Sequence, residues 1–406
     1  MLPERLSNEL CSLRPDEDKL CMSVIVEMDQ QAKVIRHKIC RTVIRSNYRL
    51  TYRQAQELLE NSSQLKVDSG QLREALQVLN GLAKQLRANR FRQGAINFET
   101  PEVHFRLDEQ NEPIEIFFHN SLDTNHLIEE FMLLANRIVA TAIGKVKADN
   151  GEVKKSEEAK PMVYRVHDNP DPEKIGKLST FIKRFGLNLK VSSNSKTTHK
   201  HINALLDDCQ GMPCQTLVET LTIRSMAKAV YSTDNIGHYG LAFPYYTHFT
   251  SPIRRYPDMM VHRLVSRYLL QSKAKCRADK EELEQACVHC SECELAAQMA
   301  ERDSIKEMHA RWISSHLGEE FDAIISGVTE FGLFVQLTDT MTEGLVPIRT
   351  IEPHDYMQFD EENYCLIAAR SGNTYTLSDK VRVRVTKVDI ERKLIDFVLV
   401  EHEEYR

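Results

Sequence analysis

Two adjacent arginines, Arg254 and Arg255, follow directly on a Ser-Pro turn, and aromatic residues stand on both sides of them. Over residues 245–267 four arginines stand against one aspartate, which gives a local charge of +3 in a chain whose net charge is −6. Guanidinium groups make bidentate contacts to phosphate oxygens, and aromatic rings stack on bases. This stretch therefore predicts contact with a nucleic-acid backbone, with Tyr256 as a substrate-binding aromatic.

Phe331 and Phe334 flank Gly332 in a stretch of alternating apolar residues near the C-terminus. Such alternation predicts strands, on which at least one of the two rings would face a ligand groove. A base stacked on an aromatic ring gains about 1–3 kcal/mol whatever its identity. The alternative is that both rings are packed in the core of a barrel.

Glu129 and Glu130 interrupt the apolar stripe of a predicted helix that also carries Asn136. A glutamate near a groove could orient a ribose or a metal-bound water. The alternative for this segment is a solvated helix face.

Cys287, Cys290 and Cys293, with His289 among them, have a spacing that zinc or an iron–sulfur cluster could use. The residues around them read as one continuous helix, on which the three thiols fall along one stripe. We interpret them as a packing face, keep a metal site as the alternative, and assign no metal ligand in this chain.

Composition limits the class of protein. The chain has 406 residues, of which 42% are apolar and 28% charged, as expected of a soluble protein with two or three domains. No run of about 18 apolar residues predicts a membrane span, and the N-terminus lacks the apolar core of a secretory signal. Ten scattered cysteines indicate reduced thiols in the cytoplasm. Because the chain is mildly acidic, a nucleic-acid site must be a local groove.

Both helices and strands are predicted to position these residues. Alternation over residues 20–48 predicts two antiparallel strands, and helical periodicity then dominates, with one helix over 213–231 and a long charged one over 280–316. Five short alternating segments follow, at 321–326, 332–337, 344–348, 381–388 and 394–400, and predict a small β-barrel of OB type. We expect an α+β fold with two domains, residues 1–316 and 317–406.

Several segments resemble the ribonuclease II/ribonuclease R (RNB) family and occur in that family's order. They are residues 1–13 (MLPERLSNELCSL), 128–136 (IEEFMLLAN), 166–168 (VHD), 238–241 (HYGL) and 247–258 (THFTSPIRRYPD). The resemblance covers most of the chain, is greatest to the bacterial ribonuclease R group, and ends with an S1-like OB domain. Pro347 departs from the S1 pattern, which usually has a histidine there.

The resemblance implies a magnesium-dependent 3′-to-5′ exoribonuclease that hydrolyses single-stranded or structured RNA to nucleoside 5′-monophosphates. It implies that Arg254 contacts the scissile phosphate with Arg255 beside it, that Phe98 stacks against the terminal bases, and that Glu129 contacts a ribose. The family's magnesium ligands are aspartates that precede the segment matched by residues 1–13. We therefore expect the ligands to lie in an N-terminal segment that is missing from this sequence.

On this interpretation the chain is the C-terminal part of a ribonuclease R-like enzyme, which binds RNA weakly and does not degrade it alone. A separately encoded N-terminal half is then a candidate partner. The alternative is a non-catalytic RNA-binding protein that retains the channel wall and the OB domain. An upstream reading frame that carries an aspartate cluster would favour the split enzyme.

Overall fold

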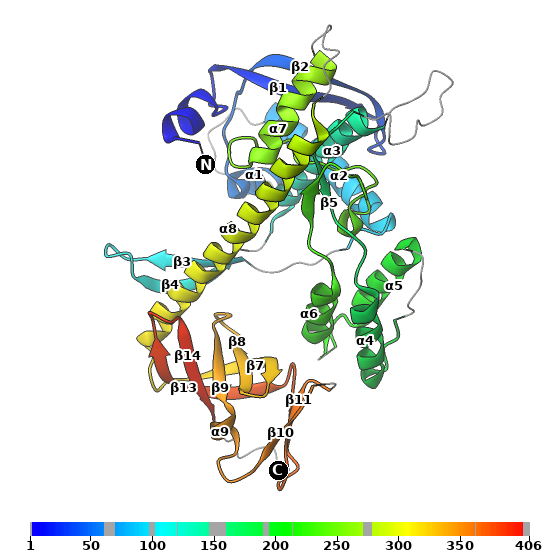
Figure 1. Cartoon of the computed structure of the whole chain (residues 1–406). Helices are drawn as coiled ribbons and strands as arrows, with labels where there is room; N and C mark the ends of the chain where they lie inside the picture. The colour runs from blue at the N-terminus through cyan, green and yellow to red at the C-terminus, as the bar shows by residue number, and fades with distance from the viewer. Residues whose placement is uncertain are drawn as a thin grey trace. The chain divides into compact units, whose positions relative to one another are not determined.

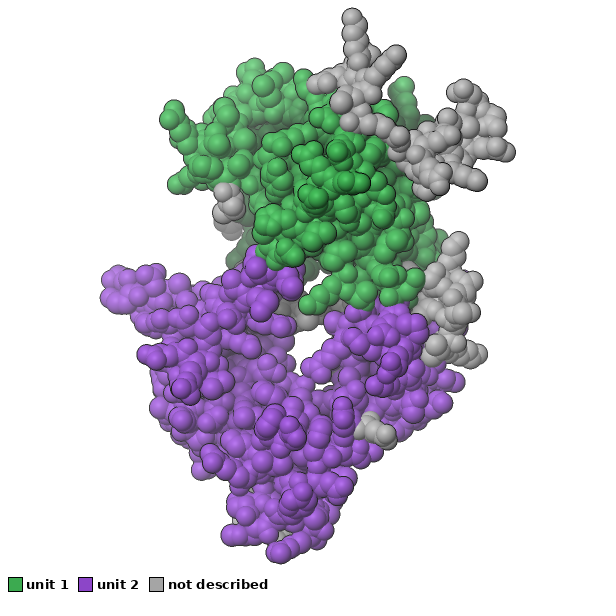
Figure 2. Space-filling view, viewed as in Figure 1, with its two compact units in different colours: residues 1–97, 121–169, 227–294 green, residues 98–120, 170–226, 295–406 purple. Residues whose placement is uncertain are grey.

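The computed structural model describes residues 2–60, 70–96, 102–119, 121–145, 160–189, 195–212, 214–270, 278–361 and 363–400. Contacts divide the chain into two compact units, which Figure 2 shows in green and purple. Unit 1 comprises residues 1–97, 121–169 and 227–294, and unit 2 comprises residues 98–120, 170–226 and 295–406. Both units contain helices and strands, which confirms the expected α+β fold.

Unit 1 combines a long hairpin with a group of helices (Figure 1). Its elements are η1 (Arg5–Leu10), β1 (Asp18–Met28), β2 (Val34–Arg45), α1 (Tyr52–Leu59), α2 (Gly70–Arg92), α3 (Asp123–Gly144), β5 (Tyr164–Val166), β6 (Val230–Ser232), η4 (Tyr239–Leu241), α7 (Tyr256–Val265), η5 (Ser266–Leu270) and the first part of α8 (Lys280–Ser314). The strands β1 and β2 pair antiparallel, as predicted.

The core of unit 1 fixes the position of the arginine turn. Ile143 of α3, Val163 beside β5, Val261 and Leu264 of α7 and Cys287 of α8 are buried in one apolar cluster. Burial of each large aliphatic side chain contributes about 1.5–3 kcal/mol. Helix α7, and with it the preceding turn, is thereby held against α3.

Unit 2 contains the predicted five-stranded barrel. Its strands are β7 (Glu320–Thr329), β8 (Gly332–Leu337), β9 (Glu343–Pro347), β13 (Lys380–Asp389) and β14 (Leu394–Leu399), and they close in the order β13-β14-β9-β8-β7. The barrel interior is filled by Ile325, Leu333, Val335, Val383 and Phe397, each at most 1% exposed. The expected OB-type barrel is confirmed.

Gly332 is required where β7 turns into β8. Its φ is +143°, and a Cβ there would stand 2.1 Å from the Val346 carbonyl oxygen. No other residue type fits at this position without moving the backbone of the neighbouring strand.

Besides the barrel, unit 2 contains elements that the sequence pattern indicated in outline, namely a strand pair and three helices, and others that it did not, among them the three strands that come last in the chain order below. These elements are β3 (Glu102–Leu107), β4 (Pro113–His119), α4 (Pro172–Ile182), η3 (Lys183–Phe185), α5 (Ser195–Asp208), α6 (Gln215–Ser225), α9 (Ile348–Ile351), β10 (Met357–Asp360), β11 (Cys365–Ala368) and β12 (Thr374–Thr376). The last three form a sheet of their own in the order β10-β11-β12, inserted between barrel strands β9 and β13.

The predicted helix over residues 213–231 is wrong at its C-terminal end. Helix α6 stops at Ser225, and Met226 has extended backbone angles (φ −77°, ψ 148°). Beyond it, Val230 and Tyr231 pair with β5, so strand pairing overrides the helical pattern. The long charged helix is confirmed as α8, which begins at Lys280 and ends at Ser314. Within the described ranges, the structure contains no helix with the length and apolarity to cross a membrane.

Candidate functional site

A buried aspartate organises the arginine turn. Asp258, in the first turn of α7, is 0% exposed. Its Oδ1 accepts a hydrogen bond from the Ser251 backbone N–H at 2.7 Å and another from Arg255 Nη2 at 2.8 Å. A carboxylate in the first turn of a helix is also stabilised by the helix dipole. The turn and Arg255 are therefore fixed by one side chain.

The two arginines of the turn lie in different surroundings. Arg255 is partly buried, with 22% of its side chain exposed, because it pairs with Asp258. Arg254 is exposed and lines a cavity of about 600 Å³, whose other lining residues are Leu2, Glu4, Ser7, Asn8, Thr250, Ser251, Pro252 and Ile253. Among the described residues no ion-pair or hydrogen-bond partner engages its guanidinium.

A second, smaller cavity brings together two residues that the sequence singled out separately. It has a volume of about 210 Å³ and is lined by Tyr52, Asn125, Ile128, Glu129, Met132, Leu133, Asn136, Tyr246 and Arg255. A carboxylate there can accept hydrogen bonds from sugar hydroxyls, and a guanidinium can donate to phosphate. The cavity therefore offers the groups that a ribose phosphate requires.

Asn136 holds this cavity in shape. Its Nδ2 donates to the Tyr246 hydroxyl at 3.2 Å, and its Oδ1 accepts from the Phe249 backbone N–H at 2.9 Å. Asn136 is 2% exposed, so these bonds are protected from water. They tie α3 to the segment that leads into the arginine turn.

Glu129 is positioned by two arginines of α2. Its Oε1 lies 3.2 Å from Arg90 Nη2, and its Oε2 lies 3.8 Å from Arg87 Nη1. Arg90 also donates from Nε to Oε1 of the buried Glu130 at 3.1 Å. Glu130 is 3% exposed, so the interpretation of this segment as a solvated helix face is wrong for Glu130. By contrast, 46% of the Glu129 side chain is exposed.

The histidines around the turn are neutral structural groups. Burial, reinforced by the nearby charges of Arg255 and Arg165, lowers the pKa of His248 to about 2. Burial lowers the pKa of His238 to about 3. His248 Nδ1 lies 2.8 Å from the Tyr231 hydroxyl. The positive charge of this region is therefore supplied by arginine alone among the side chains named here.

Phe331 and Phe334 lie on the outside of the barrel. Phe331 is 67% exposed and Phe334 37% exposed, whereas Leu333 and Val335 between and beyond them are fully buried. The alternative that both rings belong to the barrel core is therefore wrong. Their exposure leaves both rings able to stack on a ligand.

The remaining predicted residues are placed as follows. Tyr256, the first residue of α7, is 54% exposed beside Arg255. Phe98 lies outside the described residues. Tyr52 was missed by the sequence analysis, because a single tyrosine at a helix start carries no pattern that links it to Glu129 or Arg255.

The cysteine cluster belongs to a continuous helix, as predicted. Cys287 is buried in the core of unit 1 and Cys290 packs against that core, so the predicted packing face is correct for these two; it is wrong for Cys293, which is exposed. Within the described part of the chain, no group of three or more histidine, cysteine, aspartate or glutamate side chains is arranged to hold a metal ion. The described residues of this helix therefore offer no metal site.

Comparison with known proteins assigns the chain to a family. Residues 1–271 match the RNB domain, and residues 316–399 match the S1 RNA binding domain. The chain belongs to the RNB family.

Several relatives match over nearly the whole chain. Ribonuclease R of Aquifex aeolicus is 39% identical over 401 residues, which are 99% of this chain and 55% of that protein. Ribonuclease R of Escherichia coli is 34% identical, over 99% of this chain and 49% of that protein. The chain thus spans about half the length of the curated relatives it matches.

Solved structures agree with this assignment. RNase R of Mycoplasma genitalium, in its apo form and in complex with ribose methylated single-stranded RNA, is 27% identical with a TM-score of 0.88. Each match covers 98% of this chain and 60% of the other.

Proposed function

We propose that this chain forms the RNA-contacting part of a ribonuclease R-type 3′-to-5′ exoribonuclease, which hydrolyses single-stranded or structured RNA to nucleoside 5′-monophosphates. The observation that carries the proposal is the cavity lined by both Glu129 and Arg255. The M. genitalium relative in complex with RNA, and the match of residues 316–399 to the S1 RNA binding domain, support RNA as the partner.

Each site residue has a role in this proposal. Arg254 contacts the scissile phosphate, because its guanidinium is exposed and can donate two parallel hydrogen bonds to phosphate oxygens. These hydrogen bonds become stronger as negative charge develops on the oxygens during hydrolysis. Glu129 and Arg255 hold a ribose and its phosphate in their shared cavity. Phe98 stacks against the terminal bases, and Tyr256, Phe331 and Phe334 provide further aromatic contacts to RNA.

The hydrolytic step needs an activated water, which magnesium supplies when it is bound. Because the described residues hold no suitable ligand group, we propose that the magnesium ligands belong to residues other than these. The chain alone then binds RNA without hydrolysing it, and a separately encoded N-terminal half is a candidate partner.

A second candidate function is a non-catalytic RNA-binding protein. It is favoured by the described residues themselves, which offer contacts to RNA but no metal site. The two candidates agree on RNA binding by the chain alone. They differ in what is expected when a segment that carries the proposed magnesium ligands is added.

The test measures binding and hydrolysis separately. Binding of a fluorescent single-stranded RNA is followed by anisotropy, and nucleotide release from end-labelled RNA is followed with magnesium or with EDTA. The chain is assayed alone and with a candidate N-terminal half, taken from the part of the A. aeolicus relative that it does not match. The variant Arg254→Ala is assayed in the same way. Arg53→Ala, a change at an arginine whose side chain is 87% exposed, is its control for the loss of one surface charge.

Three outcomes separate the candidates. Binding alone, followed by EDTA-sensitive nucleotide release once the N-terminal part is added, supports the split enzyme. Binding without release in both cases supports the non-catalytic protein. EDTA-sensitive release by the chain alone contradicts the proposal that its metal ligands lie elsewhere, and no binding contradicts both candidates.

We also propose a domain boundary near residue 316, which gives domains 1–316 and 317–406. The start of the S1 match at residue 316 supports it, whereas the contacts group residues 295–316 with the barrel. Limited proteolysis that releases a stable fragment beginning near residue 317 would agree with the boundary. A fragment that begins near residue 295 would contradict it.

We propose a cytoplasmic location as well. The nine cysteines that the structure describes are all free. Free thiols are typical of a reducing compartment. Cell fractionation of the source organism would test this location.

A further inference from the structure

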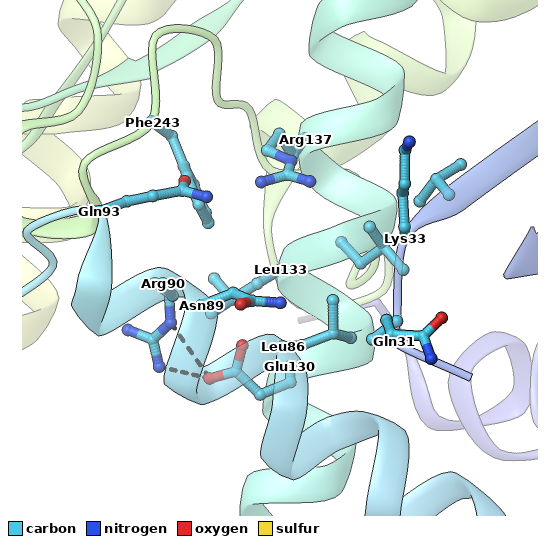
Figure 3. Close-up of a pocket in the computed structure, with 13 residues that line it drawn as sticks. Gln31, Lys33, Leu86, Asn89, Arg90, Gln93, Glu130, Leu133, Arg137 and Phe243 are labelled. Carbon is cyan, nitrogen blue, oxygen red and sulfur yellow. Dashed lines mark hydrogen bonds and ion pairs between the residues drawn. The ribbon is translucent and has the colours of Figure 1, made fainter. Parts of the chain in front are cut away.

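A third cavity of unit 1 lies on the Glu130 side of α3, and Figure 3 shows the residues around it. Its volume is about 500 Å³, within the range of small-molecule sites. It is lined by Gln31, Ala32, Lys33, Val34, Leu86, Asn89, Arg90, Gln93, Glu130, Leu133, Leu134, Arg137 and Phe243. Arg254, Arg255 and Glu129 do not line it, although Leu133 lines both this cavity and the Glu129 cavity.

Arg137 is the unusual member of this lining. Its guanidinium stands over the ring of Phe243, 5.1 Å from the ring centroid. The side chain is half-buried, and no acid or hydrogen-bond acceptor among the described residues pairs with it. Burial lowers its pKa, which the charge of Glu130 opposes. An arginine nevertheless stays protonated, so a partly desolvated positive charge remains without a counter-ion.

The other charges of the cavity do not neutralise Arg137. Among the described residues, Glu130 is the only acid that lines it, and Arg90 already engages that carboxylate, with Nε 3.1 Å from Oε1 (dashed lines in Figure 3). Lys33 adds a further positive charge from the turn between β1 and β2. The cavity therefore has a surplus of positive charge, which an anion would offset.

The uncharged lining adds hydrogen bonds and an apolar wall. The amides of Gln31, Asn89 and Gln93 can each donate and accept. Leu86 and Leu133 add apolar surface to the lining. A ligand that combines a compact anion with a polar, flat body matches this lining better than an inorganic ion alone.

We propose that this cavity binds a small phosphate-bearing ligand of mononucleotide size, with its phosphate on Arg137. The site goes beyond the proposed function, which uses the Glu129 and Arg254 cavities. Its phosphate could come from a free nucleotide or from the backbone of an RNA chain, and the same cation and amides would recognise both.

The test is isothermal titration of the purified chain with AMP, inorganic phosphate and adenosine at low salt. We expect saturable AMP binding, with adenosine at least tenfold weaker. Arg137→Met removes the charge and retains similar volume, so it should weaken AMP binding at least tenfold. Arg263→Met, at an exposed arginine of α7, is the matched control and should bind AMP as the wild type does.

Further arms identify the source and the site. If hexaadenylate displaces AMP from the wild type, the phosphate that binds Arg137 comes from an RNA backbone. If AMP stays bound, the phosphate comes from a free nucleotide. Should Arg137→Met fail to fold, Arg137→Lys, with a weaker phosphate contact, is expected to give a smaller loss. AMP affinity that is unchanged in Arg137→Met, lost in Arg254→Ala, or equal to that of adenosine would overturn the proposal.

Discussion

Arg255 Nη2 lies 2.8 Å from Oδ1 of Asp258, a carboxylate with no exposed surface. The same oxygen holds the Ser251 backbone N–H, so one buried group fixes both the turn and the arginine. Arg254 stands one residue away and has no such contact within the described residues. Arg255 therefore has a structural contact in addition to its proposed role in the ribose-phosphate cavity, whereas Arg254 is held by no such contact.

Asp258→Asn should destabilise unit 1. The amide keeps an acceptor for Ser251, but Arg255 loses its buried counter-charge, for which we expect a loss of about 1–3 kcal/mol. Urea denaturation of the chain measures this change. Asp234→Asn removes an exposed partner of Lys280 and should cost at most about 1 kcal/mol. Equal effects of the two changes would mean that Asp258 does not anchor the turn.

Arg254→Ala and Arg255→Ala should have different effects. In the chain complemented by its N-terminal part, Arg254→Ala should lower the hydrolysis rate with a loss of about 2–4 kcal/mol of transition-state stabilisation. Its unfolding transition should not change, because the side chain is exposed. Arg255→Ala should lower the unfolding midpoint, since Asp258 is left unpaired. An equal loss of RNA affinity and rate in Arg254→Ala would mean that it only anchors the backbone.

Phe331→Ala and Phe334→Ala should weaken RNA binding without unfolding the barrel. Each ring is exposed, so its loss removes a stacking surface that contributes about 1–3 kcal/mol of binding. Phe397→Ala is the contrasting change, because that ring is fully buried and its removal should cost about 3–5 kcal/mol of stability. Anisotropy with a short RNA, together with thermal denaturation, distinguishes the two effects. RNA affinity that is unchanged in both exposed variants would exclude these rings from the contact surface.

Phe98→Ala should change the length of the final product of the complemented enzyme. If this ring stacks on the terminal bases, its removal leaves short RNA ends unclamped, and digestion should stop at a different length. Gel analysis of the limit products measures this directly. The same end product for variant and wild type would refute the role.

His309 should make the barrel unit sensitive to acid. It is 6% exposed, its Nδ1 lies 2.8 Å from the Thr342 hydroxyl oxygen, and burial lowers its pKa to about 4. The unfolded chain takes up this proton below pH about 6.5, while the folded chain stays neutral down to about 4, so stability falls as pH falls through this window. The loss should reach on the order of 3 kcal/mol near pH 4.

His309→Gln removes this titration and should flatten the pH dependence of urea denaturation between pH 6.5 and 4. The free energy of unfolding at pH 7 provides the baseline for each protein. Parallel curves for variant and wild type would mean that His309 is protonated equally in both states.

The sequence predicted the barrel because each of its strands alternates over several residues between clear turns. The sheet of β10, β11 and β12 was missed, since its strands have four, four and three residues and carry too little pattern. The end of α6 was missed because Val230 and Tyr231 pair with a strand more than 60 residues earlier. Local patterns do not contain such long-range pairings.

In the site, too, local features could be predicted from the sequence and long-range contacts could not. The arginine turn and Glu129 could be recognised from their own segments, but their neighbours could not. Which of the two glutamates is buried depends on Arg90, about 40 residues earlier in the chain. Likewise, Arg254 and Arg255 are equivalent in sequence and are distinguished only by the contact of one of them with Asp258.

The shared guanidinium of Arg90 has an evolutionary consequence. Replacement of Arg90 alone leaves the buried Glu130 carboxylate without an ion-pair partner among the described residues, whereas Glu129 keeps the contact of its Oε2 with Arg87. Related sequences should therefore change positions 90 and 130 in step, for example to an apolar pair, while position 129 varies separately. Covariation between 90 and 130, stronger than between 90 and 129, is the record that such a constraint would leave.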